Sequence, residues 1–168
     1  MESRIIHSPR AVVGALTVAA CVIASAVVAG ASSGRIATLD ERIAGAQRVV
    51  VASARSVDAR WRENIYGDRL IVSRVLLDVE ETLKGSATGN AIWMDLEGGT
   101  LDGFTLRVSD LPDVRPGERA VFFLDQDANG VAMPHLRGQG ILKLNQDNVV
   151  TGSSLRLDVI RTLARGRR

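Results

Sequence analysis

The stretch RLIVSRVLLDVEETLKG, residues 69–85, decides the fold because its pattern fits either a helix or a strand. Apolar residues stand at helical spacing at Val72, Val75, Leu76, Val79 and Leu83. Alternate positions from 71 to 83 would equally form one face of a strand. The run opens with three residues that favour a pleated surface, Leu70, Ile71 and Val72, and no helix cap precedes it. The stretch therefore predicts a long strand.

This predicted strand requires one irregularity. Its inner face would consist of Ile71, Ser73, Val75, Leu77, Val79, Glu81 and Leu83. Because a charged Glu81 does not suit an apolar core, we predict a β-bulge or twist between Asp78 and Thr82 that turns Glu81 to solvent. At about 3.3 Å per residue the strand would exceed ~40 Å, a length that suits bending around a small closed sheet.

Other short apolar runs predict the rest of the sheet. They are separated by Gly, Pro and Asn turns and lie at residues 48–57, 91–97, 104–109, 120–125 and 140–144. Residues 61–68 would connect the first two strands, and Val149 with Val150 would add an edge. Trp93, within one of these runs, is predicted to lie in the core. This spacing is typical of an antiparallel barrel or sandwich.

Two helices are predicted outside the sheet. Thr38 and Glu41 have the spacing of a capping box, which begins a short helix that ends near Gln47. A second helix is expected over residues 153–165, capped by Ser153 or Ser154. Its inward side chains would be Leu155, Val159 and Leu163.

The first 31 residues indicate export. An uncharged apolar run over residues 11–31 follows Arg4 and Arg10, as in a signal peptide. Three outcomes stay open: cleavage between Ala31 and Ser32, retention as an N-terminal membrane anchor, or acylation of Cys21 within a lipobox-like sequence.

Each outcome predicts a location beyond the cytoplasm. The domain would lie in the periplasm or outside the cell, or it would be anchored to the inner membrane and face outward.

Composition divides the rest of the chain into a β domain at residues 32–152 and a basic helix or tail at residues 153–168. The chain is 46% apolar, which is adequate for a core, and its one cysteine lies in the leader. Disulfides and thiolate chemistry are therefore excluded from residues 32–168. The tail is rich in arginine but contains no aromatic residue, so we expect no nucleic-acid partner.

One motif raises the possibility of a cation site. Asp125, Asp127 and Asn129, followed by a glycine, match the opening half of a calcium loop. The twelfth position, however, is Leu136 instead of a carboxylate, and the flanking segments are predicted strands. The sequence favours a hairpin turn whose side chains bond the local backbone over a calcium site, and no other cofactor is expected.

Catalysis has little support in the sequence. His135 is the only histidine beyond the leader, no G-x-S-x-G motif occurs, and Glu80 and Glu81 would face opposite sides of a strand. We therefore predict that the domain is not an enzyme.

Aromatic and basic residues indicate a contact surface. Trp61 and Tyr66 share a polar segment with Arg60 and Arg62, a composition that is enriched at protein interfaces. The alternative is that this segment packs onto the end of the sheet.

The order of segments also resembles a known group. AQRVVVASARSV, RLIVSRVLLDVEETLKG, a Gly-Gly turn, RPGERAVFFL and GQGILKL, within residues 38–145, resemble exported bacterial domains of unassigned function. The first half is similar to the netrin-like, OB-type module of tissue inhibitors of metalloproteinases. The resemblance implies a five-stranded Greek-key barrel with flanking helices. Those inhibitors engage the protease metal through an N-terminal cysteine, which this domain lacks, so inhibition does not carry over by residue.

These observations predict a mainly β, OB-like barrel that acts as a non-catalytic binding module of the bacterial cell envelope. Its expected partner is a protein, by analogy a secreted metalloprotease. Two alternatives stay open: a metal-dependent hydrolase that uses Asp125, Asp127 and His135, and a structural, membrane-anchored envelope protein whose arginine tail contacts lipid.

Overall fold

A computed structural model describes residues 35–64, 66–86 and 89–166. The predictions for the leader, including Cys21, Ala31 and Ser32, fall outside these residues. Arg35–Arg168 forms one compact unit, so the basic C-terminal helix belongs to the same unit as the sheet. In the described part of the chain, no helix has the length and apolar character needed to cross a membrane.

The described chain is mainly β, and its predicted strands and helices are present with shifted bounds. The elements in chain order are α1 (Leu39–Gly45), β1 (Arg48–Glu63), β2 (Arg69–Lys84), β3 (Ala91–Glu97), β4 (Gly99–Leu101), β5 (Phe104–Leu106), β6 (Arg119–Gln126), β7 (Ala132–Pro134), the 3-10 turn η1 (Arg137–Gly140), β8 (Ile141–Lys143) and α2 (Leu157–Arg165). The predicted edge at residues 149 and 150 consists of isolated bridges only. Strands β4 and β7 were not predicted, because each has only three residues and neither lies within a longer apolar run.

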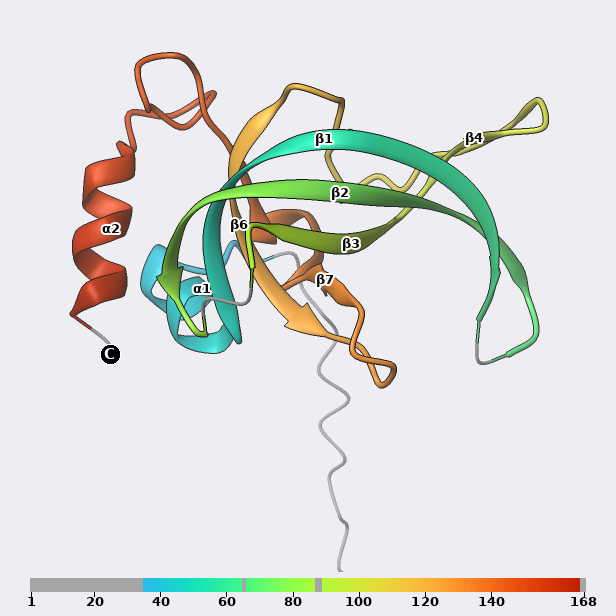
Figure 1. Cartoon of the computed structure of the whole chain (residues 1–168), viewed down its shortest axis with the longest axis horizontal. Coiled ribbons are helices and arrows are strands. Elements are labelled where there is room, and N and C mark those ends of the chain that lie inside the picture. The colour runs from blue at the N-terminus through green and yellow to red at the C-terminus, as the bar shows by residue number, and fades with distance from the viewer. Residues whose placement is uncertain (1–34, 65, 87–88, 167–168) are drawn as a thin grey trace, which may run out of the picture. The chain divides into compact units, whose positions relative to one another are not determined.

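Five strands pair in a closed ring (Figure 1). The antiparallel pairs are β1 with β2, β2 with β3, β7 with β6, and β6 with β1. The ring is completed by one parallel contact, in which Met94 of β3 lies opposite Ala132 of β7. Strand β8 extends the free part of β6, and β4 with β5 forms a separate hairpin.

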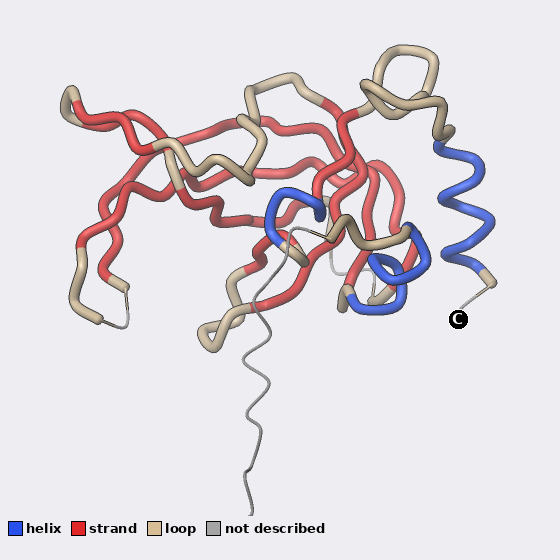
Figure 2. The backbone as a smooth tube through the Cα atoms, turned by 180° about the vertical axis from the view of Figure 1, so that it is seen from behind, coloured by secondary structure: helices blue, strands red, loops and turns tan. Residues whose placement is uncertain are grey.

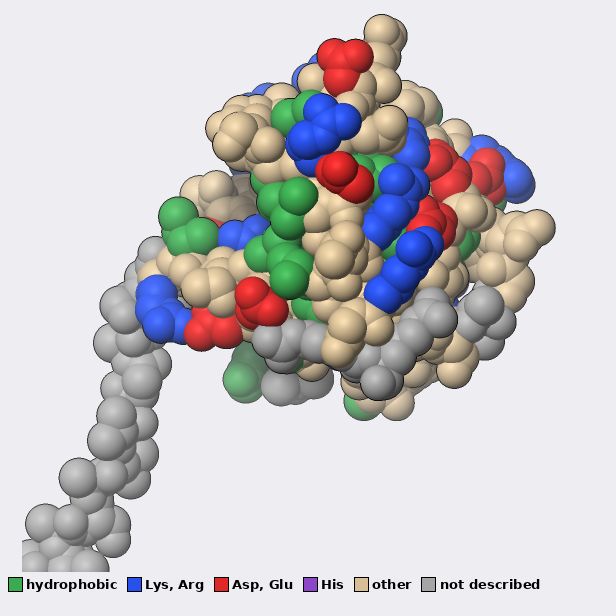
Figure 3. Space-filling view, turned by 90° about the vertical axis from the view of Figure 1, so that its left-hand side faces the viewer, with side chains coloured by type: hydrophobic (Ala, Val, Ile, Leu, Met, Phe, Trp, Pro, Cys, Tyr) green, Lys and Arg blue, Asp and Glu red, His purple; other side chains and the backbone are tan. Residues whose placement is uncertain are grey.

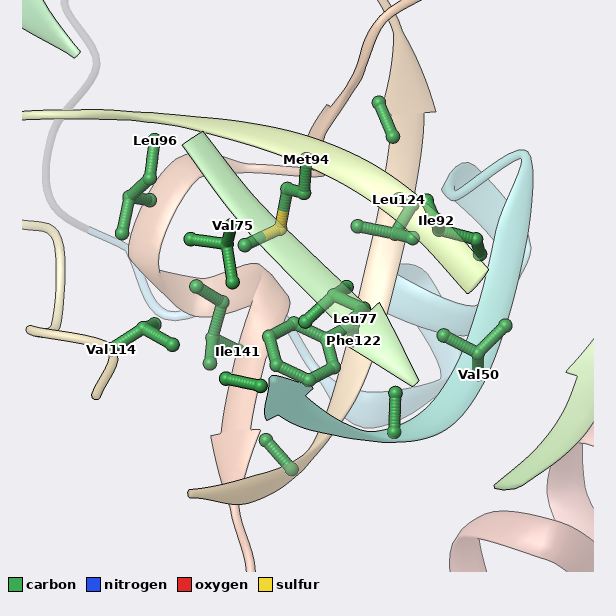
Figure 4. Packing of buried hydrophobic residues seen from close by; sticks show 14 residues of the cluster. Val50, Val75, Leu77, Ile92, Met94, Leu96, Val114, Phe122, Leu124 and Ile141 are labelled. Atoms are coloured by element: carbon green, nitrogen blue, oxygen red, sulfur yellow. The ribbon is translucent and has the colours of Figure 1, made fainter. Parts of the chain in front are cut away.

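Two layers of apolar side chains use both faces of β1. Inside the ring, Val50, Val75, Leu77, Met94 and Phe122 are fully buried and point toward one another (Figure 4). On the outer face, the helices cover a second cluster that includes Ile43, Val49, Val51, Leu83, Val121, Phe123, Leu157 and Ile160. Because the two faces alternate along a strand, the continuous run Val49, Val50 and Val51 supplies both clusters.

The predicted bulge in β2 is confirmed. Val51 lies opposite Glu81 and Ala52 lies opposite Val79, so Glu80 is the extra residue. This extra residue reverses the alternation, and Leu83 consequently packs in the outer cluster instead of inside the ring. Glu81 is not simply turned to solvent, because its carboxylate accepts a 2.8 Å hydrogen bond from Arg161 of α2.

Basic and acidic side chains alternate on the side of the molecule that carries α2. Arg161 and Arg165 both pair with Glu81, at 2.8 and 3.5 Å. Figure 3, which looks onto this side, shows arginine and lysine side chains next to aspartate and glutamate. These pairs attach the C-terminal helix to β2, although exposed pairs of this kind each contribute little free energy.

Three predictions about individual positions were wrong. Trp93 is 45% exposed, because it lies on the outer face of β3 beneath the guanidinium of Arg74. Helix α2 begins after Arg156 and has no side-chain cap, since Ser153 is used in the preceding turn. Val159 is exposed and Ile160 is fully buried, so the buried face of α2 is rotated by one residue.

Lys84 joins the short helix to the end of the long hairpin. Its ammonium donates to the main-chain carbonyls of Ile43, Ala44 and Ala46, at 2.7, 2.9 and 2.7 Å. These carbonyls lie at the C-terminal end of α1, where a positive charge is favoured and free acceptors need partners. The next residue, Gly85, has a φ of +87°, and a Cβ there would lie 2.8 Å from the carbonyl oxygen of Gln47.

We expect Lys84→Met to lower the free energy of unfolding by about 2 kcal/mol, because it removes three charge-assisted hydrogen bonds. Urea denaturation followed by circular dichroism would measure the change. Lys143→Met is the matched control, since Lys143 is the only other lysine and its pair with Glu118 is partly exposed. Equal losses in the two variants would contradict a special role for Lys84.

Candidate functional site

Three aromatic side chains lie on two hairpins, Trp61 and Tyr66 on the β1–β2 hairpin with its turn and Phe104 on the β4–β5 hairpin, and we call these three residues the aromatic end. Trp61 contacts Phe104 of β5 edge to face, with ring centroids 6.2 Å apart, and its indole NH donates to Asp102 at 3.1 Å. Arg69 lies over the Trp61 ring at 4.8 Å. Figure 2 shows the two hairpins at one end of the sheet and the helices at the other.

The aromatic end includes the most exposed aromatic side chains of the described chain. Tyr66 lies in the turn of the hairpin and is 82% exposed, and Phe104 is 65% exposed. The turn itself is ordered by Asn64, whose side-chain oxygen accepts the main-chain amides of Tyr66 and Asp68. Tyr66 is thus presented on a defined turn.

The predicted surface residues do not form one cluster. Arg60, Trp61 and Arg62 all belong to β1 instead of a loop, so the prediction of a connection over residues 61–68 was wrong for its first three residues. Successive side chains of a strand point to opposite faces, and Trp61 therefore faces away from its two arginine neighbours.

Arg60 and Arg62 surround a buried carboxylate on the opposite face from Trp61. The side chain of Asp95 is 5% exposed, and its Oδ2 accepts from Arg60 at 2.7 Å and from Arg62 at 3.1 Å. Arg74 approaches the other oxygen, Oδ1, to 4.0 Å, which is too far for a hydrogen bond. A buried carboxylate requires such positive partners, so this group holds three strands together.

Asp127 links this arginine cluster to the turn between β6 and β7. Its Oδ2 accepts from Arg62 at 2.7 Å, and its Oδ1 accepts the main-chain amides of Asn129 and Val131. The Arg62 hydrogen bond, followed by the Val131 amide, holds the pKa of Asp127 below its ordinary value. The Asp127 and Asn129 segment thus forms the hairpin turn that the sequence favoured.

Asp125 is engaged elsewhere. Its Oδ2 lies 2.7 Å from Nδ1 of His135, and its Oδ1 accepts the main-chain amide of Gln47 at 3.1 Å. The side chain of His135 is 15% exposed, so it is more buried than the loop position predicted. Asp125 and His135 are brought together, but Asp127 bonds to a different partner. Among the described residues, no group of three or more His, Cys, Asp or Glu side chains is arranged to hold a metal.

Two components of these arrangements were missed by sequence reasoning. Phe104 and Asp95 lie far along the chain from their partners on β1, and only the pairing of the strands brings them together. A charged residue within the apolar run of residues 91–97 is the one signal that would have pointed to Asp95.

A scan against protein-family models found no match, and a search of curated proteins found no significant match either. Function must therefore be inferred from the arrangement of these residues.

We expect Asp95→Asn to lower the free energy of unfolding by about 2 kcal/mol, because the neutral amide leaves converging arginines without a counter-charge. The arginines are about one-third exposed, and solvent screening keeps the loss below that of a fully buried pair. Chemical denaturation would measure the change, with Asp147→Asn at an exposed loop position as the control. Unchanged stability of Asp95→Asn would contradict the role of this carboxylate.

Asp127 should make stability depend on acid pH. Because its pKa is lower in the folded state, its ion pair stabilises the fold above the ordinary carboxyl pKa, and this contribution is lost as pH falls through the folded-state value. Thermal melts between about pH 5 and about pH 2 should show a smaller loss of stability in Asp127→Asn than in the unchanged protein. Identical pH dependence in the two proteins would show that Asp127 does not contribute.

Proposed function

We propose that the domain is a non-catalytic binding module of the bacterial cell envelope that recognises a protein partner through the aromatic end. The observation that carries this proposal is the exposure of Tyr66 and Phe104, at 82% and 65%, on the two hairpins that Trp61 joins beneath the cation of Arg69. Tyrosine and arginine are enriched among the residues that contribute most to interface energies.

The construction of the aromatic end supports this role. Trp61 is half-buried and fixed by Phe104, Asp102 and Arg69, so it attaches the β4–β5 hairpin to β1. A partner would meet Phe104 already held against Trp61, and Tyr66 on a main chain that Asn64 holds, which reduces the entropy lost on binding. Tyr66 and Phe104 are the side chains that offer new apolar area.

We also propose that the ring is an OB-like Greek-key barrel of the netrin-like kind. A closed ring of five strands with helices at one end supports this assignment. By analogy, the partner would be a secreted metalloprotease. Because residues 32–168 contain no cysteine, recognition would use the aromatic end and not a thiol bound to the protease metal. Such barrels have many functions, so this part of the proposal rests on analogy.

Export is the remaining part of the proposal. The uncharged run at residues 11–31 supports a signal peptide or a membrane anchor that places the domain in the periplasm or outside the cell.

The test is capture of the partner from envelope extracts. Relative to the unchanged protein, Tyr66→Ala combined with Phe104→Ala should retain about tenfold less of any specifically captured protein, because two exposed anchors are removed. Ile36→Ala, which removes an equally exposed apolar side chain at 74% exposure, is the control and should retain the full amount. Capture that survives the double substitution, measured by quantitative mass spectrometry, would refute the aromatic end as the binding surface.

A further inference from the structure

A pocket of about 470 Å³ lies beside the place where the ring closes, and we call it the β3 pocket. On one side it is lined by the first half of β3, residues 91–93. On the other side it is lined by residues 124–126 of β6 and by residues 130–132, which lead into β7. Gln47 and Arg48, at the start of β1, also line it. The pocket therefore lies at the end of β1 that is next to α1.

The main chain of β3 has an unpaired edge along this pocket. The carbonyl of Asn90 accepts from the amide of Val79 at 2.8 Å. Because main-chain groups alternate in direction along a strand, the next residue, Ala91, directs its amide and carbonyl away from β2. On that edge, the only pair that β3 makes within the described chain is Met94 with Ala132. The exposed Ala91 thus has a free donor and a free acceptor beside the pocket.

Arg48 brings a positive charge to the pocket that has no partner of its own. Its side chain is partly buried and makes no hydrogen bond or ion pair within the described residues. Asp125 is the only carboxylate in the lining. Both of its oxygens are already bonded, one to His135 and the other to the main-chain amide of Gln47. A carboxylate from outside the fold would therefore find Arg48 unoccupied.

Arg74 is the second arginine of the lining, and it too makes no hydrogen bond within the part of the chain that the structure describes. Its guanidinium lies over the ring of Trp93 at 5.0 Å. Its Nε lies 4.0 Å from Asp95, which is beyond hydrogen-bond distance. The three arginines around Asp95 share only two carboxylates, those of Asp95 and Asp127. Positive charge is therefore in excess beside the pocket.

We propose that the β3 pocket binds an extended acidic segment of a partner protein as an added strand. The main chain of this segment would pair with the free edge at Ala91, and its acidic side chains would accept charge-assisted hydrogen bonds from Arg48 and Arg74. Main-chain pairing provides affinity for any extended segment, whereas the arginines would select an acidic one.

This inference goes beyond the proposed function and can fail separately from it. None of the three residues of the aromatic end lines the β3 pocket. Arg48 and Glu63 are the first and last residues of β1, and Tyr66 lies in the turn that follows Glu63. The variant with Tyr66→Ala and Phe104→Ala should therefore bind an acidic segment as well as the unchanged protein does.

The two tryptophans of the chain make a direct test possible. Trp93 lines the pocket, whereas Trp61 belongs to the aromatic end. Indole ¹⁵N NMR of the full chain in neutral detergent would follow a titration with acetyl-Thr-Glu-Val-Glu-Thr amide. The Trp93 signal should shift and the Trp61 signal should not. The peptide with glutamine in place of glutamate should bind about tenfold more weakly, and the peptide methylated at every main-chain amide should not bind.

Arg48→Gln tests the contribution of charge from the side of the protein. It should weaken binding of the glutamate peptide about tenfold, because a hydrogen bond between charged groups is lost. Arg115→Gln removes an equal charge from an exposed loop position outside the pocket and should leave the affinity unchanged. The Trp61 signal reports in each variant whether the fold is retained.

Three results would each overturn the proposal. The first is a Trp93 signal that does not move with the glutamate peptide. The second is equal binding of the glutamate peptide and either the glutamine or the methylated peptide. The third is unchanged affinity in Arg48→Gln.

Discussion

The β-bulge at Glu80 allows one long hairpin to contribute side chains to both apolar clusters, the one inside the ring and the one beneath the helices. Before the bulge, β2 directs Val75 and Leu77 into the ring, and after it the same strand directs Leu83 to the outer cluster beneath the helices. Without the bulge, Glu81 would lie on the face of the ring interior. Since a buried unpaired charge is costly, the bulge and the arginines of α2 are two parts of one solution.

A second constraint concerns the half of the β1–β2 hairpin nearest its turn. Here β1 extends beyond the ring, and its two faces must be covered by other parts of the chain. One face is covered by the β4–β5 hairpin, through Trp61 and Phe104, and the other carries the arginine cluster around Asp95. The apolar side and the ionic side stabilise the same two strands by different means. This division places an aromatic surface and a cluster of ion pairs on opposite faces of β1.

Much of the fold could be predicted from the sequence because its signals are local. The capping box at Thr38 and Glu41 and the bulge within β2 were both predicted from neighbouring residues and are present. The predictions that were wrong concern positions whose environment depends on contacts between distant segments. Trp93 lies in an apolar run that was predicted to be a core strand. Its side chain nevertheless faces outward, because its neighbours Ile92 and Met94 point into the ring.

The candidate site could likewise be predicted only where its signals are local in the sequence. Trp61 and Tyr66 were identified from composition, but Phe104 enters only through packing, and the separation of Trp61 from Arg60 and Arg62 requires knowing that β1 continues to Glu63. The tie between Arg62 and Asp127, which joins two segments predicted to have different roles, has no trace in the sequence.

The ring has one weak seam. Strands β3 and β7 meet through a single pair of residues, Met94 and Ala132, whereas β1 and β2 pair along nearly their whole length despite three shifts of register. Local opening costs least where the fewest bonds must break, so transient separation of the sheet should start at this seam. Val131 and Ala132 also line two pockets, one beside Leu70 and Val72 and the other beside Ile92 and Trp93, so a small opening motion there would alter both pockets together.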